Sequence, residues 1–327
     1  MEKKCADLTP SGIKKLVILG IDHGHWQTVA RGAQSRKDVR LTAIAQETPP
    51  YADDAAASHG VKSYRNYLEC LDVEKPDMVG IAMQHGSRGR WVAEALERGL
   101  MVVADKPLCI RSDELKRIEK TLKTTGASLS LMLTERCNPV YEAIEKAVKD
   151  GQAGEVVAVE AARYYALNRA ARPSWMFDRK TYAGLILDII IHDYDLARWM
   201  TGLAWRGMDG REERSGRYDD RDFNDVAVLS GVEQGKALSL MALWHSPQKH
   251  YNRFTVYGTE GCIDLPIGAE APVLTDQKGN RRPIPLVKGL SFVERVFSAL
   301  LDGRGALPVS AGEAISLTGE LLAAGNK

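Results

Sequence analysis

Residues 14–30, KKLVILGIDHGHWQTVA, join a short apolar run to a segment whose apolar residues recur at helical spacing. The run LVILGI has the length of a buried strand, and it falls well short of the roughly 18 apolar residues that a membrane helix needs. Gly20 stands where this strand would end, and Gly24 stands just before the helix. A strand, a glycine turn and a helix in this order are typical of the first unit of a nucleotide-binding α/β sheet.

The same alternation of short apolar runs and helical segments continues to about residue 133. Runs this short and this apolar fit strands that are buried on both faces of a sheet. We therefore predict a doubly wound parallel sheet, a dinucleotide-binding Rossmann domain, over residues 1–134. The four further apolar runs are VRLTAIA (39–45), DMVGIAM (77–83), GLMVVA (99–104) and ASLSLML (127–133).

The pattern changes after Asn138-Pro139, where several runs alternate apolar with polar residues. Strands read this way when only one face of their sheet is buried. We predict an α+β domain with a large, mostly antiparallel open sheet over residues 135–327. Residues 236–245 and 252–265 are expected to be neighbouring strands of a meander. The expected strands are 155–166, 222–232, 236–245, 252–261 and 262–265, and the expected helices are 139–151, 182–202, 293–303 and 312–325.

The composition argues for a small-molecule ligand inside the cell. The 44 Lys and Arg residues nearly balance the 43 Asp and Glu residues, so no broad field attracts nucleic acid or an anionic membrane. The five cysteines are scattered without C-x-x-C spacing, which fits free thiols in a reducing compartment. The apolar run near the N-terminus is also shorter than that of a signal peptide. We expect a cytoplasmic protein with no nucleic-acid or membrane partner.

The turn after the first strand is a candidate phosphate site with an altered fingerprint. The usual G-x-G-x-x-G pattern falls here on Gly20, Asp22 and His25, and only the first position matches. Gly24 and the positive end of the following helix can still hold a phosphate, although a turn that merely needs a glycine is the alternative. We place His23 and His25 near the phosphates or the nicotinamide. We predict no metal site, because no carboxylate or cysteine lies nearby at ligand spacing.

The end of the second expected strand bears on the choice of cofactor. Gln46 holds the position where an acidic residue usually binds the ribose hydroxyls, and Glu47 follows it. An acidic side chain there repels the extra phosphate of NADP, and no arginine follows to bind that phosphate. The sequence therefore favours NAD and leaves NADP open. The alternative is that Glu47 is only a solvated loop residue.

Longer motifs extend over nearly the whole chain. Residues 59–83 and 89–115 include Asp105-Lys106-Pro107 at a strand end, and residues 135–159 carry R-x-x-P and G-x-x-G spacings. Residues 175–202, WMFDRKTYAGLILDIIIHDYDLARWMTG, contain D-x-x-x-H. In this order, the motifs resemble those of the glucose-fructose oxidoreductase and inositol dehydrogenase family, Gfo/Idh/MocA. That family has Glu-Lys-Pro where this chain has Asp105-Lys106-Pro107. It also often has t-P-n-x-x-H after the third strand, where residues 83–88 of this chain read MQHGSR and lack the proline and the final histidine.

The resemblance implies a Rossmann domain that holds NAD(P), and a second domain whose open sheet forms a dimer or tetramer contact. The family's lysine, aspartate and histidine lie around the nicotinamide and the substrate carbon, and they correspond to Lys106, Asp188 and His192. The resemblance also implies a sugar pocket beside them. Its implied cofactor residues are Gly20, Asp22, His23, Gly24, His25, Gln46, Glu47, Met83, Gln84, Arg88, Asp105 and Lys106, and its implied substrate residues are Lys106, Tyr165, Trp175, Asp188 and His192, with Tyr164 nearby.

The spacing of these residues suits the oxidation of an alcohol. Asp188 and His192 are four residues apart on an expected helix, so both lie on one face. Removal of a hydroxyl proton while hydride leaves the carbon suits histidine as general base. Lys106 would relay the proton or polarise the forming carbonyl, Asp188 would orient the reacting groups, and Asp195 would support them. A polar pair that only satisfies itself on an apolar helix is the alternative.

We therefore predict an NAD(P)-dependent oxidoreductase that transfers hydride between nicotinamide and a secondary alcohol or ketone of a sugar, cyclitol or related polyol. Two alternatives remain open. One is a glycosidase or epimerase that oxidises its substrate transiently, and the other is a nucleotide-binding sensor without catalysis. His245 and His250, in the segment 244–253, are expected in the pocket or at an interface.

Overall fold

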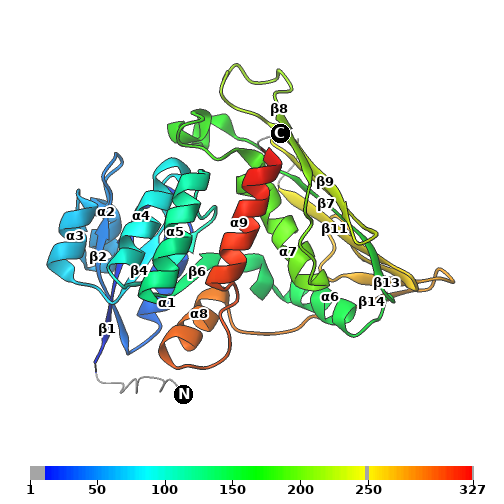
Figure 1. Cartoon of the computed structure of the whole chain (residues 1–327), viewed down its shortest axis with the longest axis horizontal. Coiled ribbons are helices and arrows are strands. Elements are labelled where there is room, and N and C mark those ends of the chain that lie inside the picture. Colours follow the sequence, from blue (N-terminus) through cyan, green and yellow to red (C-terminus); the bar gives the residue numbers. More distant parts are fainter. Residues whose placement is uncertain (1–11, 247–249, 326–327) are drawn as a thin grey trace.

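The computed structural model describes residues 12–246 and 250–325, and it arranges them around two sheets (Figure 1). The first sheet has six parallel strands in the order β3-β2-β1-β4-β5-β6, so the chain reverses its direction across the sheet between β1 and β4. This is the strand order of a dinucleotide-binding sheet, and it confirms the predicted Rossmann fold. The strands are β1 (Lys14–Leu19), β2 (Val39–Ala45), β3 (Lys62–Tyr64), β4 (Met78–Ile81), β5 (Met101–Asp105) and β6 (Leu129–Met132).

Helices cover both faces of this sheet, which explains why its strands are continuous apolar runs. All four residues of β4 are buried, as are Leu16–Leu19 of β1. Only β3 was not expected; it is three residues long, polar in sequence and paired only with β2. The helices are α1 (Trp26–Gln34), α2 (Asp53–His59), α3 (Tyr67–Glu74), α4 (His85–Glu97) and α5 (Ser112–Thr125).

The second sheet has eight strands in the order β14-β13-β12-β11-β7-β10-β9-β8, and all neighbours are antiparallel except β7 and β10. The predicted large, mostly antiparallel sheet is therefore confirmed. The predicted meander is confirmed for the antiparallel neighbours β11 and β12, and it is wrong for β10 and β11, because β7 lies between them. The strands are β7 (Val156–Tyr164), β8 (Asp209–Glu213), β9 (Val226–Glu233), β10 (Lys236–Leu243), β11 (Tyr251–Gly258), β12 (Gly261–Leu265), β13 (Val273–Asp276) and β14 (Arg281–Pro283).

The long helix expected at 182–202 begins later and in a different form. Tyr182 and Ala183 are not helical, and the helix begins at Gly184; a π-helical turn, η4 (Ile186–Ile190), is followed by α7 (Ile191–Thr201). The helix ends at Gly202, whose φ of 70° is readily adopted by glycine. Single π-helical turns occur often at functional sites. The preceding helix, α6 (Pro139–Lys149), begins where the side chain of Asn138 accepts a hydrogen bond from the backbone of Val140.

The last two helices contact both halves of the molecule. α8 (Phe292–Leu301) packs on α1, where Gly32 leaves room for Val293. α9 (Ala311–Gly325) touches α5 and β6 on one side and η4 and β8 on the other, and it stands between the two sheets in Figure 1. A hydrogen bond of 3.1 Å from the Ser130 hydroxyl to the Val309 carbonyl also joins this segment to the first sheet. The domain limits at residues 134 and 135 stay a prediction.

Two further observations bear on the composition. Cys70, Cys109, Cys137 and Cys262 are free thiols, and Cys5 lies outside the described residues. Within residues 12–246 and 250–325, no helix combines the length and the apolar character that crossing a membrane requires.

Candidate active site

A cavity of about 200 Å³ lies where the first sheet meets η4 and α7. It brings together Asp188 from η4, His192 from α7 and Lys106 from the end of β5, which is 82 residues before Asp188 in the sequence. The carboxyl ends of parallel strands are where ligands bind in open α/β sheets. The full lining is His23, His25, Lys106, Tyr165, Arg172, Trp175, Met176, Asp188, Ile189, His192, Trp244 and His250.

Lys106 and Asp188 form a buried ion pair between the two halves of the chain. Their exposed fractions are 3% and 5%, and Lys106 Nζ donates to the Asp188 carboxylate and, at 2.8 Å, to the Asp188 backbone carbonyl. The Tyr182 hydroxyl donates to the other carboxylate oxygen at 2.8 Å. Burial alone would raise the pKa of Asp188, but the charge of Lys106 outweighs it and lowers that pKa. Asp188 is therefore ionised and fixed, and it cannot swing away without leaving Lys106 buried and unpaired.

His192 lies beside this pair with unused hydrogen-bonding capacity. It is 9% exposed, and its Nδ1 atom has no hydrogen-bond partner among the described residues. Burial, and then the charge of Lys106, lowers the pKa of His192 well below its ordinary value. The imidazole is therefore neutral near pH 7, which is the form that can accept a proton.

Asp105 brings together the two histidines of the first turn. Its carboxylate is fully buried, with one oxygen 2.7 Å from His23 Nδ1 and the other 2.7 Å from His25 Nδ1. Burial would raise the pKa of Asp105, but the two histidines and Arg88 outweigh it and hold that pKa well below its usual range. The aspartate that replaces the family's glutamate thus fixes two rings that line the cavity.

This cluster corrects one premise of the sequence analysis. The sequence shows no carboxylate at ligand spacing from His23 and His25 because Asp105 is distant in sequence, yet one ligand atom from each of the three residues lies within 4.8 Å of the others. Imidazole and carboxylate are suitable ligands for transition metals. The contact of 2.7 Å between His25 Nδ1 and Asp105 is a hydrogen bond, whereas His23 Nδ1 and the Asp105 oxygen that faces it are buried without a hydrogen-bond partner among the described residues. The absence of a metal at this cluster stays a prediction.

The first turn can accept a nucleotide diphosphate. Gly20 has a φ of 83°, and a Cβ there would lie 2.4 Å from Met83 Cβ, so this glycine is required by the fold. At Gly24 a Cβ would meet nothing within 4 Å, so the backbone faces open space. No partner for the backbone N–H groups of Gly24 and His25 exists within the described chain. Free N–H groups at the positive end of α1 fit the phosphates of NAD.

Asp22, which replaces the second glycine of the fingerprint, follows β1 and forms hydrogen bonds with residues just after β2 and β4. Its carboxylate accepts hydrogen bonds of 3.0 Å from Gln46 Nε2 and from the Gln84 backbone. Gln46 is fully buried and also accepts from the Ile21 backbone at 2.9 Å. Glu47 is exposed, and one of its oxygens accepts from a backbone N–H of α3 at 3.0 Å. Of the two residues after β2, Gln46 is buried and Glu47 is exposed, and the contact of either with the ribose stays a prediction.

Arg88 contacts the backbone just after β4 and β5 and does not line the cavity. Its side chain is fully buried, and its guanidinium donates to the backbone carbonyls of Met83, Lys106 and Pro107, the last at 3.1 Å. We had expected both Arg88 and Met83 to bind the cofactor. These contacts instead fit a positioning role, in which Arg88 fixes the backbone on either side of Lys106.

His85 and Tyr182 are two site residues that sequence reasoning missed. The ring of His85 lies between Trp175 and Tyr182, with centroid distances of 4.9 and 5.5 Å, and its Nδ1 accepts from the Ala183 backbone at 3.2 Å. Burial, and then the charge of Arg88, lowers the pKa of His85 well below its ordinary value. A histidine that opens the helix after β4 was the available signal for this position. Nothing local indicated Tyr182.

The candidate substrate residues separate into two groups. Tyr165, Trp175 and His250 line the cavity. Tyr164 does not, and its ring packs on Tyr251 instead. His245 contacts Asp225 and, at 2.8 Å, the hydroxyl of Ser215, whereas residues 247–249 of the same segment lie outside the described chain. Asp195 is held by Arg136 through two hydrogen bonds of 2.6 and 2.9 Å, so it supports the helix and does not line the cavity.

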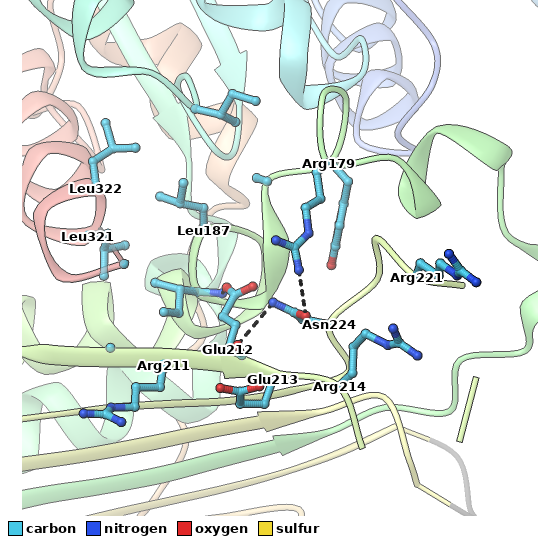
Figure 2. Close-up of a pocket in the computed structure, with 16 residues that line it drawn as sticks. Arg179, Leu187, Arg211, Glu212, Glu213, Arg214, Arg221, Asn224, Leu321 and Leu322 are labelled. Carbon is cyan, nitrogen blue, oxygen red and sulfur yellow. Dashed lines mark hydrogen bonds between the residues drawn. The ribbon is translucent and has the colours of Figure 1, made fainter. Parts of the chain in front are cut away.

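A larger cavity of about 840 Å³, which Tyr182 helps to line, is shown in Figure 2. Arg179 reaches toward Asn224 there at 3.3 Å, and Glu212 accepts from the backbone of Ile186 at 2.6 Å. Lys106 and His192 do not line it. The larger cavity is thus separate from the buried ion pair and the neutral histidine, which line the smaller one.

Comparisons with known proteins agree with this arrangement. Residues 14–132 match the profile of an oxidoreductase family with an NAD-binding Rossmann fold, Gfo/Idh/MocA, and residues 141–264 match the C-terminal domain of that family. Scyllo-inositol 2-dehydrogenase (NAD(+)) of Bacillus subtilis is 24% identical over 76% of this chain and 72% of its own length. Inositol 2-dehydrogenase of Rhizobium meliloti is 23% identical over 72% of this chain and 70% of its own length.

Solved structures show the same fold. An oxidoreductase structure from Thermotoga maritima superposes with a TM-score of 0.85 at 26% identity, covering 95% of this chain and 96% of that one. An oxidoreductase from Agrobacterium radiobacter, solved with NAD+, L-tartaric acid and magnesium, superposes with a TM-score of 0.80 at 16% identity, covering 96% of this chain and 95% of that one.

Proposed function

Because this chain belongs to the Gfo/Idh/MocA family of oxidoreductases and is an NAD-dependent enzyme, we propose that it oxidises a secondary alcohol of a sugar, cyclitol or related polyol, and reduces the ketone in the reverse direction. The observation that carries this proposal is one small cavity in which buried polar atoms lack partners. His192 Nδ1 and Trp175 Nε1 are both buried there without a hydrogen bond among the described residues. Buried polar groups are normally paired, so a ligand rich in hydroxyls fits this site.

His192, Lys106 and Asp188 each have a separate role in the proposed oxidation of the alcohol. Neutral His192 takes the proton of the reacting hydroxyl, and Lys106, which carries positive charge beside it, stabilises the oxygen as negative charge develops. Asp188 holds Lys106 in place through the ion pair and is itself held by Tyr182. NAD, when bound, accepts the hydride. In ketone reduction, His192 returns the proton to the same oxygen.

The size of the cavity limits the substrate. At about 200 Å³ it lies below the roughly 300 to 1,000 Å³ of pockets for drug-sized ligands, so we expect a single small ring or a short open chain. The named relatives include inositol dehydrogenases, whose substrate is a polyhydroxylated ring. This supports the polyol class.

The open sheet supports a further proposal, a homo-oligomer. One face of the sheet packs on η4 and α7, whereas Val232 and Val228 of β9 and Tyr257 of β11 are exposed on the other face, with fractions of 69%, 43% and 41%. Apolar residues gathered on a sheet face are typical of a contact between subunits.

The test is a spectrophotometric panel. The purified protein is mixed with NAD+ and separate polyols, aldoses and inositols, and the absorbance of NADH is followed. We expect a steady rise with at least one polyol and none with His192→Asn. Substrate conversion without net NADH would contradict net oxidation and point to transient redox chemistry.

A further inference from the structure

The loop between β7 and η4 fixes one arginine at the wall of the active-site cavity. Arg172 Nε donates to the Leu167 carbonyl at 2.9 Å, and its guanidinium carbon lies 4.8 Å from the centre of the Trp244 ring. Leu167 and Trp244 are both buried, and the Tyr165 backbone donates to the Leu243 carbonyl at 2.8 Å. The guanidinium is therefore held by its Nε and by its flat face, which leaves its two terminal nitrogens for a ligand.

Arg172 carries a positive charge that the described part of the chain leaves without an ion-pair partner. Within residues 12–246 and 250–325, no carboxylate forms an ion pair with it, although it is half-buried. Arg169, three residues earlier, shows the contrast: it is bound to Asp220 by hydrogen bonds of 2.8 and 2.9 Å. A fixed guanidinium with free terminal N–H groups matches the two oxygens of a carboxylate.

The position of Arg172 connects this charge to the chemistry. It lines the same cavity as Lys106 and His192, and Asp188, already neutralised by Lys106, is the one carboxylate among the lining residues. His250 lies beside Arg172 and packs on Tyr165 with a centroid distance of 4.4 Å. An outer cavity of about 620 Å³ shares Arg172 and His250 with the inner one, so the arginine stands at the junction of the two.

We propose that the substrate is a sugar acid whose carboxylate binds Arg172 while the hydroxyl to be oxidised lies at Lys106 and His192. This inference rests on the proposed polyol oxidation and specifies its substrate class. The carboxylate takes no part in the reaction, so the proton and hydride transfers are those already described. An aldonate or uronate fits both the small cavity and its unpaired positive charge.

The experiment compares acids with their neutral counterparts on the full chain with NAD+. The pairs are D-gluconate with D-glucitol and D-glucuronate with D-glucose, and the variants are Arg172→Gln, Arg172→Lys and, as a matched control, Arg169→Gln. A hydrogen-bonded charge pair is worth a factor of roughly 10 to 100, so wild-type kcat/KM should favour the acids by about that much. Arg172→Gln should abolish the preference mainly through KM, and Arg172→Lys should retain part of it. Arg169→Gln should leave it unchanged.

A binding measurement separates the two proposals. Quenching of NADH fluorescence by the same acids is recorded for each variant, and thermal melting confirms that each one folds. If neutral polyols are oxidised and Arg172→Gln leaves the kinetics with acids unchanged, the carboxylate proposal is wrong and the polyol function stands. If acids bind in an Arg172-dependent manner but no hydride moves, the oxidation proposal is wrong and the carboxylate site stands. Absence of both binding and turnover overturns both.

Discussion

Replacing Lys106 with methionine tests whether this residue acts on the substrate or only holds the site together. The substitution keeps the length of the side chain and removes the ammonium group that contacts Asp188. Among the described residues, Asp188 would then keep the Tyr182 hydroxyl as the one side-chain partner of its buried carboxylate. Breaking one side of a buried ion pair costs about 3 to 5 kcal/mol, so we expect the free energy of unfolding of Lys106→Met to fall by that amount.

The expected loss of activity has a different origin and can be separated from the loss of stability. Removing one donor that stabilises a developing negative charge lowers kcat by roughly 10²- to 10³-fold. In the double variant Lys106→Met/Asp188→Asn, no uncompensated charge remains buried, and much of the stability should return. Turnover should not return, because the positive charge at the reacting oxygen is still absent.

Three measurements complete this test: urea denaturation at neutral pH, steady-state NADH formation with an oxidised polyol, and NADH binding by fluorescence. We expect both variants to bind NADH, because the free backbone N–H groups of the first turn do not depend on Lys106. If the double variant recovered kcat together with stability, Lys106 would be a structural residue and the proposed mechanism would be wrong.

Three further outcomes are expected. Gly20→Ala should destabilise the fold by a few kcal/mol, because a Cβ there meets Met83 at 2.4 Å, whereas Gly24→Ala should fold normally and weaken NADH binding in a titration. Because burial lowers the pKa of His85, the unfolded chain takes up a proton below about pH 6.5 that the folded chain excludes, and stability falls with decreasing pH. His85→Asn should therefore reduce the slope of unfolding free energy against pH in this range by about 1.4 kcal/mol per unit; an unchanged slope would show that His85 already titrates in the folded state. Val232→Lys should lower the oligomer mass measured by light scattering, and an unchanged mass would place the contact elsewhere.

The sequence predicted those parts of the fold in which burial produces a regular pattern of apolar residues. β1, β2, β4, β5 and β6 are buried on both faces, and each one reads as an apolar run. β3, β8 and β14 are short and largely polar, so no pattern distinguishes them from loops. The position of β7 between β10 and β11 follows from pairing over long sequence distances, which alternation along a strand does not encode.

The site was predictable to a smaller extent. The motifs placed Lys106, Asp188 and His192 together, and all three line one cavity. The contacts around them come from segments distant in sequence, as in the pairing of Asp105 with two histidines some 80 residues earlier. Arg172 was not predicted as a site residue for the same reason, because the neighbouring sequence does not distinguish it from other arginines in polar loops.

Helix α9 also limits how the two halves of the molecule can move. Domains joined by small contacts usually rock against each other, and many enzymes use such motion to admit a cofactor. Here α9 touches α5 and β6 as well as η4 and β8, and the Lys106–Asp188 pair joins the same two halves nearby. A wide rotation would have to detach α9 from one side and separate two buried charges. We therefore expect nucleotide exchange to depend on small displacements of loops at the strand ends, with the angle between the sheets almost constant through turnover.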